Sequence, residues 1–228
     1  GYGMTEAAPI ISVNRPGKYK TGTVGPPAPA IEVRIAENGE IVCRGENVML
    51  GYHNQPEATA AVIDGDGWLH TGDVGEIDED GYVRITDRIK DIIVLSNGEN
   101  VAPQPIESQL KSSPHISQIV LFGDGREVMT AIGVPDFDSV RAWASDGGIS
   151  LPEETEDLIE IPEVRELILA EIGRLSEGLT QYQRVRDIAL LPQELTPEND
   201  ELTPTLKVKR RVVVERYGHL LWGTEGES

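Results

Sequence analysis

The alternation of apolar and polar residues predicts β-strands in the first third of the chain. Ile31–Ile35 alternates with a period of two, Asn38-Gly39 is typical of a hairpin turn, and Ile41–Arg44 returns as the partner strand. Tyr82–Thr86 has a similar strand-like composition. Pro56–Ile63 begins with proline and contains alanines, which predicts a short helix. We therefore expect a β-rich part that includes one short helix.

The pattern changes after residue 88. The apolar segment Ile92–Leu95 predicts a strand, Pro103–Lys111 a helix, Ile116–Phe122 and Val128–Val134 two apolar strands, and Phe137–Ala144 a second helix. Strands and helices mixed in this order are typical of a small α+β domain. The sequence thus predicts an α+β protein, with a β-rich part over residues 1–88 and a small α+β domain over residues 89–228.

Three apolar features are expected to be structural. Pro162–Leu179 predicts the clearest helix of the chain, and its single apolar stripe belongs in a core. The stripe consists of Val164, Leu167, Ile168, Ile172, Leu175 and Leu179. Cys43 is the single cysteine and lies in an apolar run, which favours a small buried side chain over a nucleophile. Gly45–Tyr52 has glycines at both ends of an apolar segment and is expected to be a loop packed against the sheet.

Composition and charge exclude several classes of protein. The chain has 228 residues, is 39% hydrophobic and carries a formal net charge of -19. This charge argues against a nucleic-acid binder, because a polyanionic partner requires a basic surface. No run approaches the roughly 18 apolar residues of a spanning helix, and the N-terminus lacks the order of a signal peptide. We expect a cytoplasmic protein in which local cations hold any anionic ligand.

The first six residues, Gly1-Tyr2-Gly3-Met4-Thr5-Glu6, are a candidate ligand-binding loop. Glycines on both sides of a tyrosine suit a tight loop whose backbone approaches a flat ligand. The Thr5 hydroxyl and the Glu6 carboxylate could serve a phosphate group and its magnesium ion. The alternative is a simple turn with a surface Thr-Glu pair.

Asp73 is a second candidate. It follows Thr71-Gly72 at the entrance to a strand, where a carboxylate can accept hydrogen bonds from both hydroxyls of a ribose. The alternative is an Asx-type turn without a ligand. A calcium loop is not expected nearby, because the acidic residues fall in two separate turns without the required order. Those residues are Asp64, Asp66, Asp78, Glu79 and Asp80.

Two charged segments complete the candidates. Asp87-Arg88-Ile89-Lys90-Asp91 lies between two predicted strands and is expected to be a hinge that also carries a ligand contact. Residues 207–216 hold five cations in an otherwise acidic chain. A solvated helix face would explain them, and a membrane or nucleic-acid contact is a weaker alternative. Lys207 precedes the predicted helix, so it could instead act as a point charge on a phosphate or carboxylate.

Taken in order, these segments resemble the adenylate-forming superfamily of acyl-CoA synthetases, luciferases and peptide-synthetase adenylation domains. The resemblance is carried by Tyr-Gly-Met-Thr-Glu, Thr-Gly-Asp, Asp-Arg-Ile-Lys-Asp and Leu-Thr-Pro-Thr-Leu-Lys-Val-Lys-Arg. Ser96–Pro103 and the Leu-Thr-Pro-Thr form of the tail are similar to the long-chain fatty acyl-CoA ligase branch. The likeness extends over the whole chain.

The resemblance implies roles for individual residues. The nucleotide-binding loop would be formed by Gly1, Tyr2, Gly3, Met4 and Thr5. In that loop Tyr2 would pack on adenine and Thr5 would meet the α-phosphate.

Glu6 would hold Mg²⁺, and Asp73 would take the ribose hydroxyls with Arg88 beside it. Lys207 matches the lysine that reaches the α-phosphate and the acyl carboxylate. This lysine acts in the first half-reaction, in which a fatty acid attacks ATP and gives acyl-AMP and pyrophosphate. Positioned cations of this kind are the main stabilisers of phosphoryl transition states.

The resemblance also implies a mobile small domain. Lys90 falls on the family's pivot position, and a rotation there after adenylation would withdraw Lys207. The loop Ser96, Asn97, Gly98 and Glu99 would then face CoA for thioester formation, a domain movement that alternates two active sites. ATP, Mg²⁺ and CoA are therefore the expected cofactors, and a fatty acid is the expected substrate.

Family members carry a glycine-rich phosphate loop and the walls of an acyl tunnel upstream of the Tyr-Gly-Met-Thr-Glu segment. Gly17-Lys18-Tyr19-Lys20 is a poor substitute for that loop. We therefore expect the chain to be the C-terminal portion of a larger ligase, to need the N-terminal domain of the same polypeptide as its partner, and to be inactive alone. A peripheral membrane contact, a carrier protein as acyl acceptor, and a non-catalytic interaction module stay open as alternatives.

Overall fold

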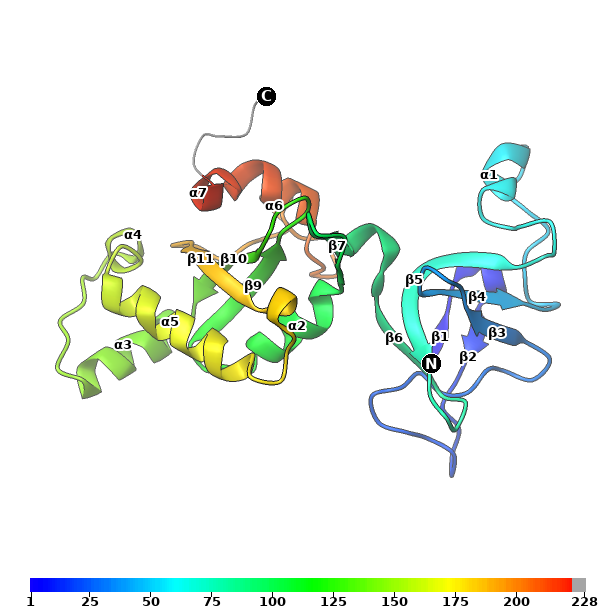
Figure 1. Cartoon of the computed structure of the whole chain (residues 1–228), viewed down its shortest axis with the longest axis horizontal. Helices are drawn as coiled ribbons and strands as arrows, with labels where there is room; N and C mark the ends of the chain where they lie inside the picture. Colours follow the sequence, from blue (N-terminus) through cyan, green and yellow to red (C-terminus); the bar gives the residue numbers. More distant parts are fainter. Residues whose placement is uncertain (223–228) are drawn as a thin grey trace. The chain divides into compact units, whose positions relative to one another are not determined.

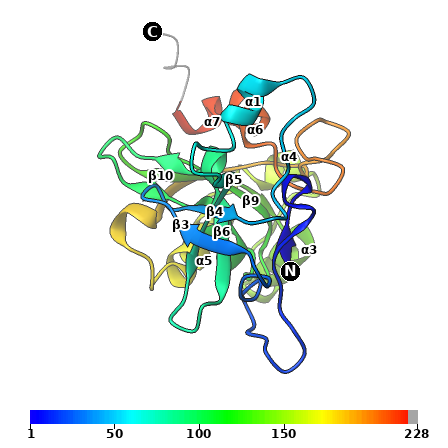
Figure 2. The same cartoon turned by 90° about the vertical axis from the view of Figure 1, so that its right-hand side faces the viewer.

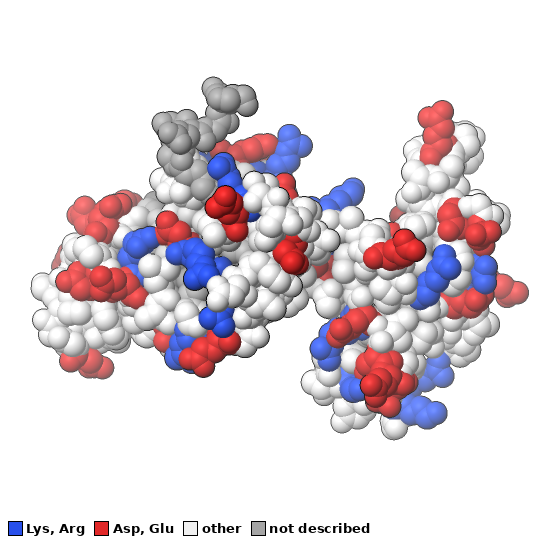
Figure 3. Space-filling model, viewed as in Figure 1, with Lys and Arg blue, Asp and Glu red and all other residues white. Residues whose placement is uncertain are grey.

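The computed structural model describes residues 1–222 of the chain. The chain is divided into two compact units, Gly1–Asp91 and Ile92–Ser228. The division falls after Asp91, close to the boundary that the sequence suggested after residue 88. Figure 3 shows acidic and basic side chains interspersed over both units on the face in view.

The first unit is organised by a four-stranded antiparallel sheet in the order β3-β4-β5-β6 (Figure 1). Its strands are β3 (Glu32–Ile35), β4 (Glu40–Arg44), β5 (Leu69–Ile77) and β6 (Val83–Arg88). The expected hairpin is confirmed, because Ile35 pairs with Ile41 and Gly39 in the turn has a φ of 83°. Glycine adopts such a φ without steric cost, as this kind of turn requires.

A two-stranded antiparallel ribbon, β1 (Tyr2–Gly3) and β2 (Ile10–Ser12), carries the N-terminal segment. The short 3-10 helix η1 (Thr5–Ala7) lies between the two strands. Gly3 is required here, since a Cβ atom at this position would lie 1.7 Å from the carbonyl oxygen of Pro9. The glycine therefore serves a close backbone approach within the protein.

The helix α1 (Pro56–Ala60) is shorter than the expected Pro56–Ile63. The chain leaves the helix early because Ile63 forms an isolated β-bridge with Leu69 and the Val62 carbonyl accepts the His70 N–H at 2.8 Å. Tertiary pairing with the start of β5 thus ends the helix. Figure 1 and Figure 2 both show α1 standing clear of the sheet.

The core of the first unit lies between the sheet and the N-terminal ribbon. Its fully packed members are Tyr2, Ala7, Ile11, Ile41, Cys43, Leu69 and Val83. Cys43 is completely buried, and burial raises the pKa of its thiol to about 11. The expectation of a small buried side chain at this position is confirmed.

The second unit contains a three-stranded sheet in the order β11-β10-β9. β9 (Ile116–Phe122) and β10 (Met129–Pro135) are antiparallel and match the two expected strands, whereas β11 (Val185–Leu190) is parallel to β10. The sequence did not predict β11, because Arg186 and Asp187 interrupt its short apolar run. A short ribbon of β7 (Ile93–Val94) and β8 (Asn100–Val101) precedes the sheet, and η2 (Ile89–Asp91) precedes β7.

Helices cover both faces of this sheet. Figure 1 shows α2 and α5 on one side and α6 and α7 on the other. The helices of the unit are α2 (Pro103–Leu110), α3 (Phe137–Asp146), α4 (Thr155–Leu158), α5 (Pro162–Leu175), α6 (Arg210–Tyr217) and α7 (His219–Trp222), with the 3-10 turn η3 (Gln181–Gln183) before β11. Neighbouring strand residues point to opposite faces, so Leu121 joins the core under α5 while Val120 joins the core under α6.

The apolar stripe of α5 is core, as expected. Val164, Ile168 and Ile172 are buried against the sheet, and Leu175 and Leu179 are partly buried beside them. The helix ends at Leu175 instead of continuing to Leu179. Further along the chain, Thr180 and Gln183 form a capping box that begins η3.

Candidate functional site

Three segments that are distant in the sequence meet at Asp73. The Tyr2 hydroxyl donates a 2.7 Å hydrogen bond to Asp73 Oδ2, and Arg88 Nε lies 3.4 Å from Asp73 Oδ1. Arg88 is the residue that faces Asp73 across the β5–β6 ladder. These two contacts hold the carboxylate from two sides. The Asp73 side chain is 18% exposed, so a ligand can still contact it. The expected pairing of Asp73 with Arg88 is therefore present in the fold.

A local bulge in β5 sets the direction of Asp73. The pairing of β4 with β5 is irregular at this point, and Gly72 has a φ of 74°. The Thr71 hydroxyl donates to the Ile41 carbonyl at 2.6 Å and accepts the Asp73 N–H at 3.2 Å. Bulges of this kind turn a side chain out of the regular alternation of a strand.

A buried carboxylate supports the bulge from beneath. Glu40 is 5% exposed and accepts the Gly72 N–H at 2.8 Å, while its other oxygen lies 2.7 Å from His70 Nδ1. Neither Glu40 nor His70 was predicted from the sequence. Their pairing depends on the β4–β5 register, which the local pattern does not contain.

Tyr2 is 9% exposed and belongs to the core of the first unit. Burial raises the pKa of its hydroxyl well above the ordinary value, and the neighbouring Asp73 carboxylate raises it further against a lowering contribution from Thr71. The hydroxyl thus stays protonated at neutral pH and donates its proton to Asp73. The role of the Tyr2 ring in stacking on adenine stays a prediction.

Glu6 lies in η1 and is held by a second tyrosine. Its Oε1 accepts a 2.9 Å hydrogen bond from the Tyr52 hydroxyl, and its main-chain carbonyl accepts the Met49 N–H at 2.8 Å. The hydrogen bond to Glu6 is the main reason why the pKa of Tyr52 is raised. The pattern of Gly45–Tyr52 indicated only a structural loop, so Tyr52 was not predicted as a site residue. Thr5 is exposed next to Glu6.

Glu6 and Thr5 fit a magnesium ion that is coordinated mainly by phosphate oxygens and water and by few protein groups. Over residues 1–222 no three histidine, cysteine or acidic side chains are grouped to hold a metal. Magnesium usually takes one or two protein carboxylates and fills its remaining positions with phosphate oxygens and water. Glu6 could supply such a carboxylate with the exposed Thr5 hydroxyl nearby.

Lys207 lies in a loop of the second unit between residues Leu202 and Val208, which form an isolated β-bridge. The Thr203 hydroxyl accepts the Lys207 N–H at 3.0 Å, and the Lys207 carbonyl accepts the Thr203 N–H at 2.8 Å. Leu206 has a φ of 59°. Lys207 thus lies at the closing end of the turn, and its side chain is exposed.

The other four cations of residues 207–216 form ion pairs. They are Lys209 with Asp200, Arg210 with Glu107, Arg211 with Glu215 and Arg216 with Glu201. Among the ion pairs of the described residues none involves Lys207. A solvated helix face fits Arg211, whose side chain is 92% exposed, but not Arg210, whose side chain is 15% exposed.

The segment expected to face CoA is the turn of the β7–β8 ribbon. Ser96, Asn97, Gly98 and Glu99 are exposed, and Gly98 has a φ of 84°. The Asn97 side chain accepts the Glu99 N–H at 3.0 Å, and the Ser96 N–H is bonded to the Arg126 carbonyl. The turn is ordered by its own hydrogen bonds, and its contact with CoA stays a prediction.

The expected hinge lies where β6 ends. Arg88 is the last residue of the strand, and the next three residues form the single turn η2. Lys90 is exposed in the middle of that turn. Its role as a pivot stays a prediction.

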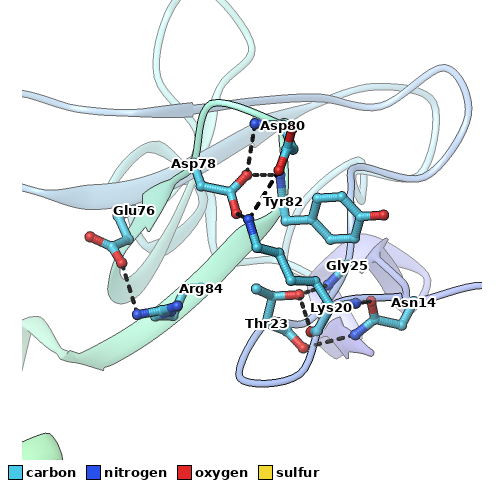
Figure 4. A network of polar contacts seen from close by, with 9 residues as sticks. All are labelled: Asn14, Lys20, Thr23, Gly25, Glu76, Asp78, Asp80, Tyr82 and Arg84. Carbon is cyan, nitrogen blue, oxygen red and sulfur yellow. Dashed lines mark hydrogen bonds and ion pairs between the residues drawn. The ribbon is translucent and has the colours of Figure 1, made fainter. Parts of the chain in front are cut away.

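Lys20 ties a surface loop to the sheet and does not point to a phosphate site. Figure 4 shows its ammonium group between two carboxylates of the β5–β6 turn. Nζ lies 2.6 Å from Asp78 and 3.1 Å from Asp80, and the Asn14 side chain accepts the Lys20 N–H. The expectation that Gly17–Lys20 is a poor substitute for a phosphate loop agrees with this use of the lysine.

Along residues 1–222, no helix is both long enough and apolar enough to cross a membrane.

Family comparisons match both parts of the chain. Residues 1–53 match the AMP-binding enzyme family, and residues 90–220 match the AMP-binding enzyme C-terminal domain. The long-chain-fatty-acid–CoA ligase FadD15 of Mycobacterium bovis is 37% identical over 95% of this chain and 36% of its own length. The putative fatty-acid–CoA ligase fadD11 of Mycobacterium tuberculosis is 38% identical over 95% of this chain and 38% of its own length.

Solved structures give the same relationship. The A domain of a carboxylic acid reductase from Segniliparus rugosus, in complex with AMP and a co-purified carboxylic acid, has a TM-score of 0.74 and 27% identity. The match covers 97% of this chain and 34% of that one. The chain thus spans about a third of the length of the proteins that it matches. It belongs to the adenylate-forming AMP-binding enzymes, whose C-terminal domain it contains, and its curated relatives are long-chain fatty acid–CoA ligases.

Proposed function

We propose that this chain is the C-terminal part of an ATP-dependent long-chain fatty acid–CoA ligase. In the first half-reaction a fatty acid carboxylate attacks the α-phosphorus of ATP, which forms acyl-AMP and releases pyrophosphate. In the second, the thiol of CoA attacks the acyl carbonyl, which forms the thioester and releases AMP. The long-chain ligases among the relatives support this substrate class.

Asp73 is proposed to bind the ribose of the nucleotide. Its carboxylate is fixed by Tyr2 and Arg88, and each oxygen retains an acceptor position for a ligand hydroxyl. An ionised acceptor strengthens such hydrogen bonds. The AMP bound in the similar reductase domain supports a nucleotide site in this family.

Glu6 and Thr5 are proposed to serve the phosphates. Glu6 would contribute one carboxylate oxygen to Mg²⁺, and Tyr52 orients that carboxylate through its 2.9 Å hydrogen bond. Magnesium, when bound, neutralises charge on the phosphate oxygens. The Thr5 hydroxyl would donate to the α-phosphate.

Lys207 is proposed to be the catalytic lysine of the first half-reaction. The observation that carries this assignment is the contrast in its charged segment, where four cations are paired and Lys207 is exposed on a closed turn. Because no ion pair within residues 1–222 involves Lys207, its ammonium group can bind an anion without first breaking such a pair. It would stabilise the charge that develops between the carboxylate and the α-phosphate.

Lys90 is proposed as the pivot between the two half-reactions. Rotation at η2 would exchange the Lys207 loop for the β7–β8 turn, which carries Gly98 and would approach CoA. The position of Lys90 at the end of the first compact unit, one residue before its last residue Asp91, supports this proposal. The chain alone, without the rest of the ligase, is expected to lack activity.

The test is palmitate-dependent exchange of pyrophosphate into ATP by the full-length ligase. Lys207→Ala is expected to lower the exchange rate by roughly 100- to 1000-fold, as for other lost transition-state contacts. Arg211→Ala is the matched control, since Arg211 is 92% exposed and paired with Glu215 on the same segment. Undiminished exchange in Lys207→Ala would contradict the assignment and would favour a non-catalytic interaction module.

A second candidate is an adenylating enzyme that passes the acyl group to a carrier protein. The match to the A-PCP didomain of a carboxylic acid reductase, at 29% identity and a TM-score of 0.71, favours this possibility. Replacing CoA with a pantetheinylated carrier protein in the second half-reaction distinguishes the two. Faster acyl transfer to the carrier than to CoA would exclude the CoA ligase.

A further inference from the structure

The segment Glu201–Lys209 combines an exposed tip with a buried stem. The tip residues Pro204–Lys207 are exposed. At the stem, Leu202 is 7% exposed and Val208 packs against the same core cluster beneath α6. The loop that carries Lys207 is therefore anchored in the core at both ends.

The side chain of Glu201 is completely buried at the base of this loop. Its Oε1 accepts hydrogen bonds from Arg216 Nη1 at 2.6 Å and from the Tyr217 hydroxyl at 2.5 Å. Its Oε2 accepts the Thr196 N–H at 3.0 Å. One carboxylate thus connects α6 to the segment that leads into the loop.

The main chain of Glu201 closes the stem. Its carbonyl accepts the Lys209 N–H at 2.8 Å, and its N–H donates to the Thr196 carbonyl at 3.1 Å. Lys209 also pairs with Asp200, whose φ of 63° is uncommon for a residue other than glycine. The entrance and the exit of the loop therefore meet at Glu201.

A buried carboxylate of this kind must be compensated. Removing a charged group from water costs several kcal/mol unless it is paired and hydrogen-bonded. Burial acts most strongly on the pKa of Glu201 and raises it, but the hydrogen bonds from Tyr217, Thr196 and Arg216 outweigh burial and leave the pKa below its ordinary value. Glu201 is therefore ionised at neutral pH.

The tip has a fixed conformation of its own. Thr203 and Lys207 exchange two hydrogen bonds, and the Leu206 N–H donates to the Thr203 carbonyl at 2.8 Å. Leu206 has a left-handed φ of 59° and a side chain that is 70% exposed, so burial of that side chain does not explain the conformation. The direction of the chain at Lys207 is thus determined by the turn and by its stem.

We propose that Glu201 is a positioning residue for Lys207, because its buried carboxylate locks the stem of the loop that presents the lysine. Lys207 then reaches the acyl-phosphate centre by movement of the second unit, without a separate ordering of the loop. This inference rests on the proposed function of Lys207. A misplacement of about 1 Å can lower a rate by roughly 100-fold, so the effect of losing the anchor is measurable.

The first readout is amide hydrogen exchange in the 228-residue chain. NMR monitors the exchange at Thr203, Leu206 and Lys209. In Glu201→Gln these amides are expected to exchange roughly 10-fold faster or more, as local opening allows, while amides of β9 and β10 keep their protection. Glu215→Gln is the matched control, because Glu215 is exposed on α6 and pairs only with Arg211 among the ion pairs of the described residues.

The second readout separates the half-reactions of the full-length ligase. Glu201→Gln is expected to lower kcat for acyl-AMP formation by roughly 10- to 100-fold, with KM for ATP and for the fatty acid within about twofold. Thioester formation from supplied acyl-AMP should be retained. Tyr217→Phe removes one hydrogen bond and keeps the ring. It should change both amide exchange and acyl-AMP formation in the same direction as Glu201→Gln, but by a smaller factor.

Unchanged loop exchange together with unchanged acyl-AMP formation in Glu201→Gln would overturn the inference. Equal losses in both half-reactions would also overturn it, since they would indicate a general loss of structure. Lys207→Ala is measured in parallel. If that variant retains acyl-AMP formation, the proposed function fails; if it loses activity while Glu201→Gln does not, only the positioning role fails.

Discussion

Replacing Glu107 with alanine is expected to destabilise the second unit by about 3 to 5 kcal/mol, the range for removing one partner of a buried ion pair. Glu107 Oε1 lies 2.8 Å from Arg210 Nη1 and accepts the Leu121 N–H at 2.8 Å. The side chains of Glu107 and Arg210 are 8% and 15% exposed. Water therefore cannot easily replace the lost carboxylate.

The magnitude follows from the groups that would be left behind. Alanine leaves the Leu121 N–H without its acceptor, at a cost of about 1 to 3 kcal/mol. It also leaves the Arg210 guanidinium without its counter-charge, although its Nη1 still donates to the Leu121 carbonyl at 2.6 Å. Arg210 Nε is already buried without a hydrogen-bond partner among residues 1–222. Because a domain of this size is stable by only about 5 to 15 kcal/mol, the loss is large enough to resolve.

The assay is urea unfolding of the 228-residue chain, followed by far-ultraviolet circular dichroism. The variants are Glu107→Ala, Glu107→Leu, Arg210→Met and the double variant Glu107→Leu with Arg210→Met, which removes both charges and fills their space with apolar atoms. The double variant should be much closer to the wild type than the sum of the single losses. Additive losses, or a loss in Glu107→Ala as small as the roughly 1 kcal/mol of an exposed pair, would refute the reasoning.

Three further predictions concern the hinge, the loop anchor and the nucleotide site. Lys90→Pro restricts φ at the proposed pivot and should damage one half-reaction of the full-length ligase more than the other; equal losses would count against a pivot. The lowered pKa of Glu201 contributes stability that is fully present above the ordinary carboxyl pKa and is lost as the pH falls from that value through the folded pKa, so the wild type should lose stability faster than Glu201→Gln in urea titrations from about pH 5 down to about pH 3. Tyr2→Phe removes one donor to Asp73 and should raise KM for ATP about 3- to 10-fold in steady-state assays, whereas an unchanged KM would exclude Tyr2 as the orienting group.

The elements that the sequence predicted are those with a strong local pattern. The β3–β4 hairpin combines alternation with an Asn-Gly turn, and α5 has an apolar stripe over several turns. Both signals depend on residues that are close together in the chain. Strand β11 was missed because it is short, carries Arg186 and Asp187, and is stabilised by parallel pairing with the distant β10.

Strand β5 shows why the candidate site was harder to predict than the fold. Leu69–Ile77 contains Gly72 and Gly75 and has an irregular register with both of its neighbours, so its pattern lacks regular alternation. The family resemblance identified Asp73, but the bulge that aims it depends on Glu40, more than thirty residues earlier in the chain. A register-dependent partner of this kind leaves no local signal.

The same limit applies to the loop that carries Lys207. Resemblance to known motifs identified Lys207, and the charge pattern alone could not separate it from the four neighbouring cations. The ion pairs of the fold make that separation. Glu201 gave no signal in the sequence either, because a glutamate near a basic helix is ordinarily exposed.

The most direct test of the whole account measures the two half-reactions of Lys207→Ala separately in the full-length ligase. In a single turnover with palmitate and ATP, formation of acyl-AMP should fall by roughly 100-fold or more. When palmitoyl-AMP and CoA are supplied instead, the thioester should form at a rate within about twofold of the wild type, because the lysine acts only in the first step. Normal acyl-AMP formation in this variant, or an equal loss in both steps, would contradict the central claim that Lys207 is the lysine of adenylate formation.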